Sequence, residues 1–551
     1  MSARRVVQGV AGAAVLIAVL TLLARLAGFG RTLVFTNTVG ADSTGDTYLA
    51  ANNVPNIVFE VVAGGALASL VVPMLAGGIA AGDREQVRQT ASALLGWTLL
   101  LLIPLSAVIA LLAEPIVRLL LAPGTPDAEV ALAARFLLVF APQVALYGIG
   151  IVLTGVLQAH RRFAGPAIAP LLSSLVVAAA YLLFAGMGGD GEAADLTTPA
   201  ELVLGVGTTL GVVALTLSLL APMRGLRLRI RPALRFPVGA APRVRRLALA
   251  GVLTLAGQQL VAAVAIRLAS DGPDGTQVVY AAGLTVFLVP WAALAVPLAT
   301  SAYPGLAERA SAGDEPGYRS ALAPAAVLIV AASAVAAGLL VAVAGPMARV
   351  FLGDGSDAVV GALRNTIIAF APGLIGYGLV ALLTRALYAR GLWKSPTVCV
   401  AGGWLLAVVA DVVLAGQLPA ADRGLALGAG HTLGVTVAGA GLLVVVARTA
   451  GRGALAGVVR VGGPALVASA LGAAGGLTLA RALGADPVPD PGILAAVGSG
   501  LLVAALVLGI IVAVMTATAR SPLAGAVRAL RAPERRPADR PESDRQVVHG
   551  D

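Results

Sequence analysis

The chain has 551 residues, of which 58% are hydrophobic and only 12% are charged, and its formal net charge is +10. Soluble domains carry charge on about one quarter of their residues, so this composition excludes an ordinary cytosolic enzyme and indicates a membrane protein. The only lysine, Lys394, follows a tryptophan, which excludes a Walker-type ATP-binding loop, and the only cysteine, Cys399, excludes an internal disulfide.

Apolar segments long enough to cross a bilayer recur along the whole chain. A spanning helix needs about 20 apolar residues, and fourteen segments meet this requirement. The predicted fold is therefore all-α, a polytopic membrane protein with about 14 transmembrane helices. In chain order the segments lie within 8–38, 48–80, 89–112, 132–158, 165–187, 199–222, 247–269, 278–306, 320–346, 360–386, 396–416, 424–446, 460–483 and 492–517.

Charges in the loops predict the orientation of these spans. If the N-terminus is cytoplasmic, the outward loops contain more Asp and Glu than Arg, whereas the inward segments are rich in Arg. Cytoplasmic loops of membrane proteins carry such an excess of positive charge. Because the predicted number of spans is even, both termini are predicted to be cytoplasmic.

A repeated pattern divides the chain into two halves. Pro73-Met-Leu-Ala with Gly82-Asp83 has a counterpart in Pro304-Gly-Leu-Ala with Gly313-Asp314, and Arg162-Phe163-Ala-Gly-Pro166 has one in Leu392-Trp393-Lys394-Ser-Pro396, each about 230 positions later. The repeat predicts two pseudo-symmetric lobes of six helices plus two C-terminal helices. Two similar bundles in one membrane are typical of a transporter with its site between them. The predicted regions are 1–223 and 247–450 for the lobes, 224–246 for a linker, 451–518 for the last two spans and 519–551 for a tail.

Two basic segments lie outside the predicted spans. Eight arginines occur between Arg224 and Arg246. They favour a topology anchor resting on anionic lipid head groups, and the alternative is a docking site for a cytoplasmic partner. The tail from 519 is basic and then rich in proline, which predicts a helix on the membrane surface followed by disorder.

Two arginines interrupt the first span, in Arg25-Leu-Ala-Gly28-Phe29-Gly30-Arg31. A charge at this depth needs a cavity or a partner. The guanidinium group is permanently charged and matches phosphate or carboxylate oxygens, so Arg25 and Arg31 are predicted to bind an anion. Gly28 and Gly30 are predicted to form a hinge. The alternative is a structural ion pair with Glu60.

Polar residues also line one stretch of the second span. Asn53, Asn56 and Glu60 lie in this span, and Asn56 and Glu60 are one helical turn apart on the same face. Such a stripe inside an apolar helix is predicted to line a cavity, and adhesion between helices is the alternative. Pro55 among the asparagines suggests a broken helix and is a further predicted hinge.

Weaker candidates lie in later spans. Gln259 and Arg267, in the seventh span, could line the opposite wall of the cavity, although Arg267 could equally extend toward outer head groups. Asp411 and His431 are candidates for coupling transport to a proton or another cation. The three histidines lie far apart without metal-ligand spacing, and the sequence predicts no metal, no cofactor and no enzyme active site.

Several of these motifs together resemble the MurJ/MviN family of the multidrug/oligosaccharidyl-lipid/polysaccharide exporter superfamily. The resemblance covers roughly residues 8–450. It rests on Arg25-Leu-Ala-Gly-Phe-Gly-Arg31, Gly40-Ala-Asp with Asp46, Val54-Pro55-Asn56, Gly65-Ala66-Leu with Val72-Pro73, Leu157-Gln-Ala-His-Arg-Arg162 with Pro166 and Ala169-Pro170, Gly373-Leu-Ile-Gly376, Tyr388-Ala-Arg390 and Lys394-Ser-Pro396.

The resemblance implies flipping of lipid II, the polyprenyl-diphosphate-linked peptidoglycan precursor, from the inner to the outer leaflet of a bacterial plasma membrane by alternating access. Arg25 and Arg31 then match essential first-helix arginines, and Asp46 and Asn56 match polar second-helix positions. An arginine of the family pattern is replaced by Phe59, and an Asp-Arg pair by Ala282-Gly283. These departures keep two alternatives open: export of another lipid-linked oligosaccharide or a drug, and a transport-inactive cell-wall scaffold.

Overall fold

The computed structural model describes residues 3–61, 68–189, 192–235, 240–488 and 492–531, and within these ranges the regular structure is helical with no β-strand. The first half contains α1 (Ala3–Thr38), α2 (Ser43–Glu60), α3 (Ala68–Ala80), α4 (Arg84–Leu111), α5 (Ala113–Leu120), α6 (Asp127–Phe140), α7 (Gln143–Ala159), α8 (Ala164–Gly186), α9 (Thr198–Ser218) and α10 (Leu220–Arg224).

The second half follows the same order of long and short helices. It contains α11 (Ala240–Ala269), α12 (Thr276–Pro290), a π-helical turn (Trp291–Ala295), α13 (Val296–Ser311), α14 (Glu315–Ala342), α15 (Ala344–Leu352), α16 (Asp357–Phe370), α17 (Gly373–Ala389), α18 (Lys394–Gln417) and α19 (Arg423–Thr449), and then α20 (Val458–Ala482), α21 (Ile493–Thr518) and α22 (Arg520–Arg531).

The helices confirm the predicted all-α membrane fold. Among the described residues, eleven helical segments are long and apolar enough to cross a bilayer, and α16 with α17, bent by 44°, forms a twelfth. The two other predicted spans coincide with α2 plus α3 and with α11. Neither can be counted as a full span, because residues 62–67 are not described between α2 and α3 and because the side chains of α11 are described only from Leu255 to Ala269.

The repeat seen in the sequence has the same local geometry in both halves. Gly82 and Gly313 both have a φ of +69°, a left-handed conformation that favours glycine. The aspartate after each glycine caps the next helix: Asp83 accepts a hydrogen bond from the Gln86 amide at 2.8 Å, and Asp314 accepts one from the Gly317 amide at 2.9 Å. The two turns are therefore equivalent, as expected for a duplicated lobe.

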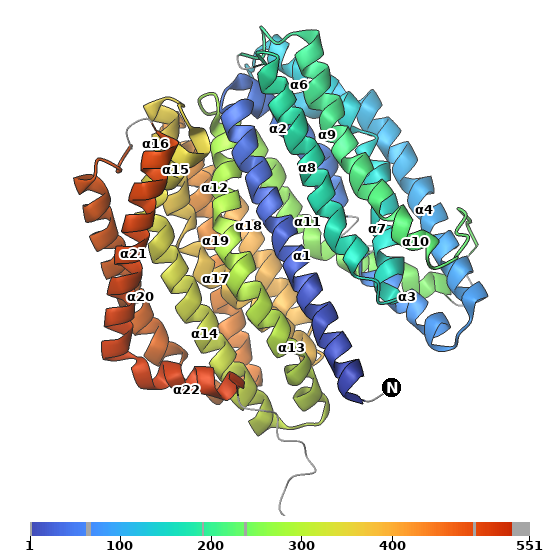
Figure 1. Ribbon diagram of the computed structural model, residues 1–551, viewed down its shortest axis with the longest axis vertical. Helices are drawn as coiled ribbons and strands as arrows, with labels where there is room; N and C mark the ends of the chain where they lie inside the picture. Colours follow the sequence, from blue (N-terminus) through green and yellow to red (C-terminus); the bar gives the residue numbers. More distant parts are fainter. Residues whose placement is uncertain (1–2, 62–67, 190–191, 236–239, 489–491, 532–551) are drawn as a thin grey trace, which may run out of the picture.

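Each half of the chain has its own core. In the first half, the Tyr48 hydroxyl is within 2.9 Å of the Tyr181 hydroxyl and 2.8 Å of the Thr208 hydroxyl, among buried aromatic rings. In the second half, Phe287 and Phe370 pack together with ring centroids 5.3 Å apart. In Figure 1, α1 runs obliquely between the two groups of helices and packs on α8, with contacts to α12 and α15.

The last helices lie on the outer side of the second half. Helices α20 and α21 pack on α14, and α22 lies across one end of the bundle, beneath α14 (Figure 1). Leu523 and Ala526 of α22 join this packing, so the start of the tail is helical. Its position on a membrane surface remains a prediction. The rest of the tail, 532–551, is outside the described residues.

The linker between the halves is shorter than predicted. Helix α11 begins at Ala240, because the Ala- and Arg-rich segment before 247 favours helix over loop. Before it, residues 228–235 run along α4 without helical structure, and Ser92 accepts hydrogen bonds from the amides of Arg231 at 3.2 Å and Ala233 at 3.0 Å. Apolar Leu226, Leu228 and Ile230 face the core, while the arginines between them are exposed. The other region boundaries remain predictions.

Candidate functional site

Arg25 and Arg31 lie on α1 without any partner among the described residues. Arg25 is exposed and Arg31 is half-buried. Neither guanidinium group makes a hydrogen bond or an ion pair with another described residue, and the same holds for the Glu60 carboxylate. The alternative of a structural ion pair with Glu60 is therefore wrong for this conformation. A permanent cation in the apolar part of a span, without an acidic partner, is available to an anionic ligand.

Tyrosines of the first half surround Arg31. It interacts electrostatically with Tyr147 and Tyr181. The Tyr147 hydroxyl donates a hydrogen bond to the Asn56 side-chain oxygen at 3.2 Å, and its ring lies 4.5 Å from that of Phe59. The site thus joins α1, α2, α7 and α8, and Phe59 contributes an aromatic surface where the family pattern has an arginine.

The predicted hinges are not visible as breaks in this conformation. Helix α1 is continuous through Gly28 and Gly30, and a methyl group added at either glycine would meet no atom within 4 Å. Helix α2 is likewise continuous through Pro55, so the expected break there is wrong. The α-helix ends after Glu60 instead. Hinge roles for the three residues remain predictions, because one conformation does not test bending.

Asn53 and Glu60 face different surroundings on α2. Asn53 is half-buried and Glu60 is exposed at the end of the helix. The Glu60 carboxylate interacts electrostatically with Tyr377 of α17, so it lies on the side of α2 that faces the second half. Glu60 is therefore the residue of the predicted polar stripe that approaches the opposite lobe.

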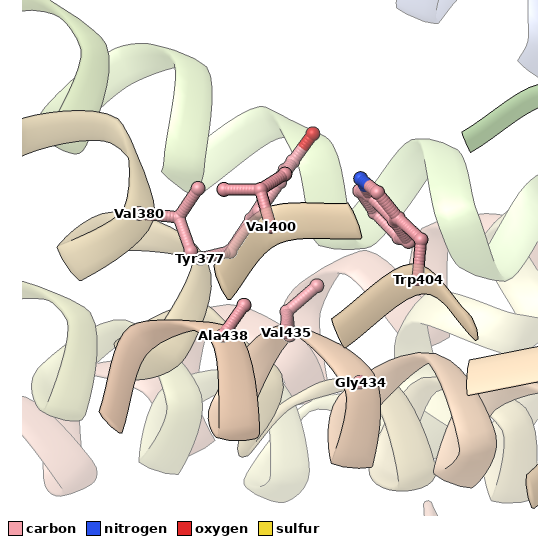
Figure 2. Close-up of a pocket in the computed structure, with 7 residues that line it drawn as sticks. All are labelled: Tyr377, Val380, Val400, Trp404, Gly434, Val435 and Ala438. Carbon is pink, nitrogen blue, oxygen red and sulfur yellow. The ribbon is translucent and has the colours of Figure 1, made fainter. Parts of the chain in front are cut away.

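Aromatic side chains form the corresponding wall of the second half. The Trp291 and Tyr377 rings are 4.5 Å apart and nearly parallel, and the Trp291 indole N–H donates to the Tyr377 carbonyl at 3.2 Å. Figure 2 shows the Tyr377 hydroxyl and the Trp404 indole nitrogen on the same side of a small apolar pocket of about 10 Å³. Neither polar atom has a hydrogen-bond partner among the described residues, so both are available to a ligand.

Gln259 and Arg267 are not grouped with the arginines of α1. Gln259 is buried in the middle of α11, and Arg267 is half-buried in its last turn. Arg267 is two residues from the end of its helix and Arg25 is thirteen residues from the end of α1. At 1.5 Å per residue, this difference of eleven residues separates their levels by about 16 Å. A joint grip on one phosphate by Arg25 and Arg267 is not supported in this conformation.

Asp411 and His431 lie inside the second half, and the His431 ring contacts the Tyr377 and Trp404 rings. A methyl group added at Gly430, next to His431, would meet the Asp411 carboxylate at 1.9 Å. Both ring nitrogens of His431 and one oxygen of Asp411 are buried without a hydrogen-bond partner in the described part of the chain. Phe287, Phe370 and Trp404 surround the imidazole. A coupling role for this pair remains a prediction.

The two halves are joined at the opposite end of the bundle from the N-terminus. Asp46 of α2 accepts hydrogen bonds from the amides of Gly275 at 2.9 Å and Val278 at 3.0 Å, and so caps the N-terminus of α12 across the lobes. Nearby, the Asn37 side chain donates to the Phe351 carbonyl at 2.9 Å. We call this contact region the seam. The sequence offered one signal for it, the Gly272-Pro-Asp-Gly-Thr276 turn that leaves the start of α12 without a cap of its own.

Acidic residues concentrate at the seam. Burial and the neighbouring Asp274 raise the pKa of Asp42 to about 6, although hydrogen bonds from the amides of Gly45 and Thr44 lower it. A pocket of about 30 Å³, the seam pocket, lies between the carboxylates of Asp46, Glu129 and Asp274.

The fold and the site together define the class of protein. Two equivalent six-helix lobes with two additional helices, closed against each other at one end and carrying unpaired arginines between them, are typical of an alternating-access membrane transporter. The family model described as "Lipid II flippase MurJ" matches residues 35–482. The chain therefore belongs to this family.

Relatives and solved structures agree with the family. The chain is 27% identical over 422 residues to the probable lipid II flippase MurJ of Rhizobium tropici, covering 74% of this chain and 75% of that one. It is 25% identical to the lipid II flippase MurJ of Burkholderia cenocepacia over 75% of this chain and 80% of that one.

Two solved structures share the fold. One is described as lipid II flippase MurJ in an inward closed conformation, with a TM-score of 0.70 and 17% identity over 90% of this chain and 98% of that one. The other is an inward-facing multidrug transporter of the MATE family, with a TM-score of 0.64 and 14% identity over 79% of this chain and 98% of that one. At these identities the likeness shows the fold alone.

Proposed function

We propose that this protein flips lipid II, or a closely related polyprenyl-diphosphate glycolipid, from the inner to the outer leaflet for cell-wall synthesis. Membership of the family and the names of its relatives support this substrate. The observation in the structure that supports it best is that the guanidinium groups of Arg25 and Arg31 have no partner among the described residues.

The physical argument concerns the diphosphate. A charged headgroup does not cross hydrocarbon unaided, because removing its hydration costs several kcal/mol or more. Charge-assisted hydrogen bonds from arginine to phosphate offset part of this cost. The lobes would hold the headgroup between them while the polyprenyl tail stays in the bilayer, and rocking about the seam would expose the headgroup to the other side. Nothing in this cycle needs a bond to be made or broken, so we propose a transporter and not an enzyme.

The proposed orientation places both termini in the cytoplasm. The Arg25 side of the bundle would then face inward and the seam outward, so that the described conformation is closed at the outer side. The exposed arginines of the linker would lie among anionic head groups on the cytoplasmic side, where they could also bind a cell-wall regulator. Fusing a cytoplasm-active reporter after 531 and after 190 tests this topology: only the first fusion should be active.

The flipping assay is complementation of a conditional lipid II flippase depletion, read out as lipid II in the outer leaflet. Arg25→Gln with Arg31→Gln should lower flipping by about 100-fold, because two charge-assisted hydrogen bonds, each worth about 1.5 kcal/mol, are lost. Arg460→Gln, on an exposed arginine of α20, is the matched control and should flip normally.

The same variants separate the alternatives. A transport-inactive scaffold would support growth whether or not Arg25 and Arg31 are charged, and normal growth of the double variant without outer-leaflet lipid II would contradict the proposed function. An exporter of another glycolipid would fail to complement the depletion even as the unmodified chain, although it should still bind vesicles that contain polyprenyl diphosphate.

A further inference from the structure

The seam pocket is built from oxygen atoms of both lobes. Besides Asp46, Glu129 and Asp274, it is lined by Ser43 and Ser270, among others. Asp46 and Glu129 belong to α2 and α6 of the first half, whereas Ser270 and Asp274 lie in the connection between α11 and α12. The pocket therefore exists only while the two halves are in contact at this end.

The negative charge of the pocket is not balanced by arginine. Asp274 repels Asp42, Asp46 and Glu129, and none of these three carboxylates forms an ion pair within the described residues. The guanidinium group of Arg423, whose side chain lies beside Gly272 of the pocket, is bound to Asp271 at 2.9 Å. Closing the seam thus brings carboxylates together at a cost in repulsion that something else must offset.

A second, independent feature also indicates a ligand. The side chain of Gln277 lines the pocket and is only 5% exposed. Its carbonyl oxygen is buried without a hydrogen-bond donor among the described residues. A buried acceptor without a donor destabilises the structure, so an atom that accepts its lone pair would stabilise the closed seam.

We propose that the seam pocket binds a small divalent metal cation, Mg²⁺ or Ca²⁺, from the outer side, and that this ion holds the two lobes together at the seam. Oxygen ligands are those that both ions prefer. The volume of about 30 Å³ admits one ion with one or two waters. Within the described residues no group of three or more His, Cys, Asp or Glu side chains could hold a metal by itself, so hydroxyl and amide oxygens of the pocket and water would have to complete the coordination.

The ion would bias the transport cycle, a step that rests on the proposed alternating access. Its ligands separate when the lobes open at the seam, so the ion binds only the closed form and shifts the closed-to-open ratio by a factor of 1 + [ion]/Kd. At ten times the Kd this is about a tenfold shift. Outer divalent cations would thus favour the return of the empty transporter to its inward-facing form.

The test measures the distance across the seam directly. In a Cys399→Ala background, spin labels are placed at Ala128→Cys of the first half and Ser356→Cys of the second, both exposed at this end. The distance distribution is recorded in proteoliposomes during titration with MgCl2 or CaCl2, against NaCl of equal ionic strength. We expect the short-distance population to rise and saturate, with the ratio of short to long distances about tenfold higher at ten times the Kd, which NaCl does not reproduce.

Variants locate the effect. Glu129→Gln, Asp274→Asn and the uncharged change Gln277→Leu should each raise the apparent Kd by at least tenfold. Asp354→Asn, at an exposed carboxylate of the same end, should leave it unchanged. An absent response, or one that is equal in all variants, would overturn the proposal. Because the assay contains no lipid II, its result is independent of the flipping assay, and failure of either leaves the other interpretable.

Discussion

The two ends of this protein differ in how their polar groups are satisfied. At the seam, the Asp46 carboxylate accepts hydrogen bonds from the backbone of the opposite lobe at 2.9 and 3.0 Å. Toward the other end, Arg25 is exposed on α1 and has no partner in the described part of the chain. The hydrophobic Leu22 and Leu26 of α1 are exposed around it. One end is thus closed by hydrogen bonds between the lobes and the other is available to a ligand, as alternating access requires.

The largest effect on the difference between the two ends is expected at the seam, where the backbones of the two lobes approach closely. Gly275 has a φ of +85°, and a methyl group there would lie 2.2 Å from the Ala41 carbonyl oxygen. Gly275→Ala should therefore push the lobes apart and lower the closed population at least tenfold in the spin-label measurement, since relieving such a clash needs a shift worth roughly 2 kcal/mol or more.

The matched control for this clash is Gly124→Ala. Gly124 has a φ of +97° but no atom within 4 Å of an added methyl group. It carries the same backbone strain, about 1 kcal/mol, without a contact at the seam. If both variants shift the distance distribution equally, the seam is not the element that holds the lobes together.

A smaller effect is expected from the cap itself. Asp46→Ala removes both acceptors of the α12 amides, and loss of a helix cap costs about 1 kcal/mol. The closed population should fall about fivefold. Asp314→Ala removes a cap inside one lobe and should lower the melting temperature similarly without changing the distance across the seam. If Asp46→Ala instead lowered the melting temperature without changing the distance across the seam, Asp46 would act only in the folding of its own lobe.

The smallest expected effect is the pH dependence of the seam. The pKa of Asp42 is raised from 3.8 to about 6 by burial and by Asp274. Opening the seam would return the pKa toward its ordinary value, so the closed form binds more protons between pH 4 and pH 6 and gains stability as the pH falls through this window. The short-distance population should rise between pH 7.5 and pH 5, and Asp42→Asn should reduce that rise. An Asp42→Asn variant with an unchanged profile would assign the titration to Glu129 or Asp46.

Much of the fold could be predicted, because each membrane span is recognisable from the hydropathy of its own residues. Every predicted segment coincides with one helix or two consecutive helices, and the Gly82 and Gly313 turns have the same φ. The start of α11 at Ala240 was missed because the segment before 247 is too polar for a membrane span although it favours helix. Hydropathy locates the part of a helix that crosses the membrane, not the ends of the helix.

The site was predicted less completely. Arg25 and Arg31 could be found, because a charge in an apolar span stands out whatever its neighbours are. The grouping with Arg267 was not supported, since sequence gives no relative height for residues on different helices. No feature of the sequence indicates that the Gln277 side-chain oxygen is buried without a donor, because this depends on which atoms pack around it.

The sequence by itself determined the membrane fold, the two lobes and the cations of α1, because the hydrocarbon imposes an apolar composition on each span independently of the others. Only the tertiary structure decided that Asp46 bonds the amide of Gly275, 229 positions later at the start of α12, and that carboxylates from both lobes share one pocket. Such contacts depend on where two distant backbones meet, and no local pattern of residues specifies that meeting point.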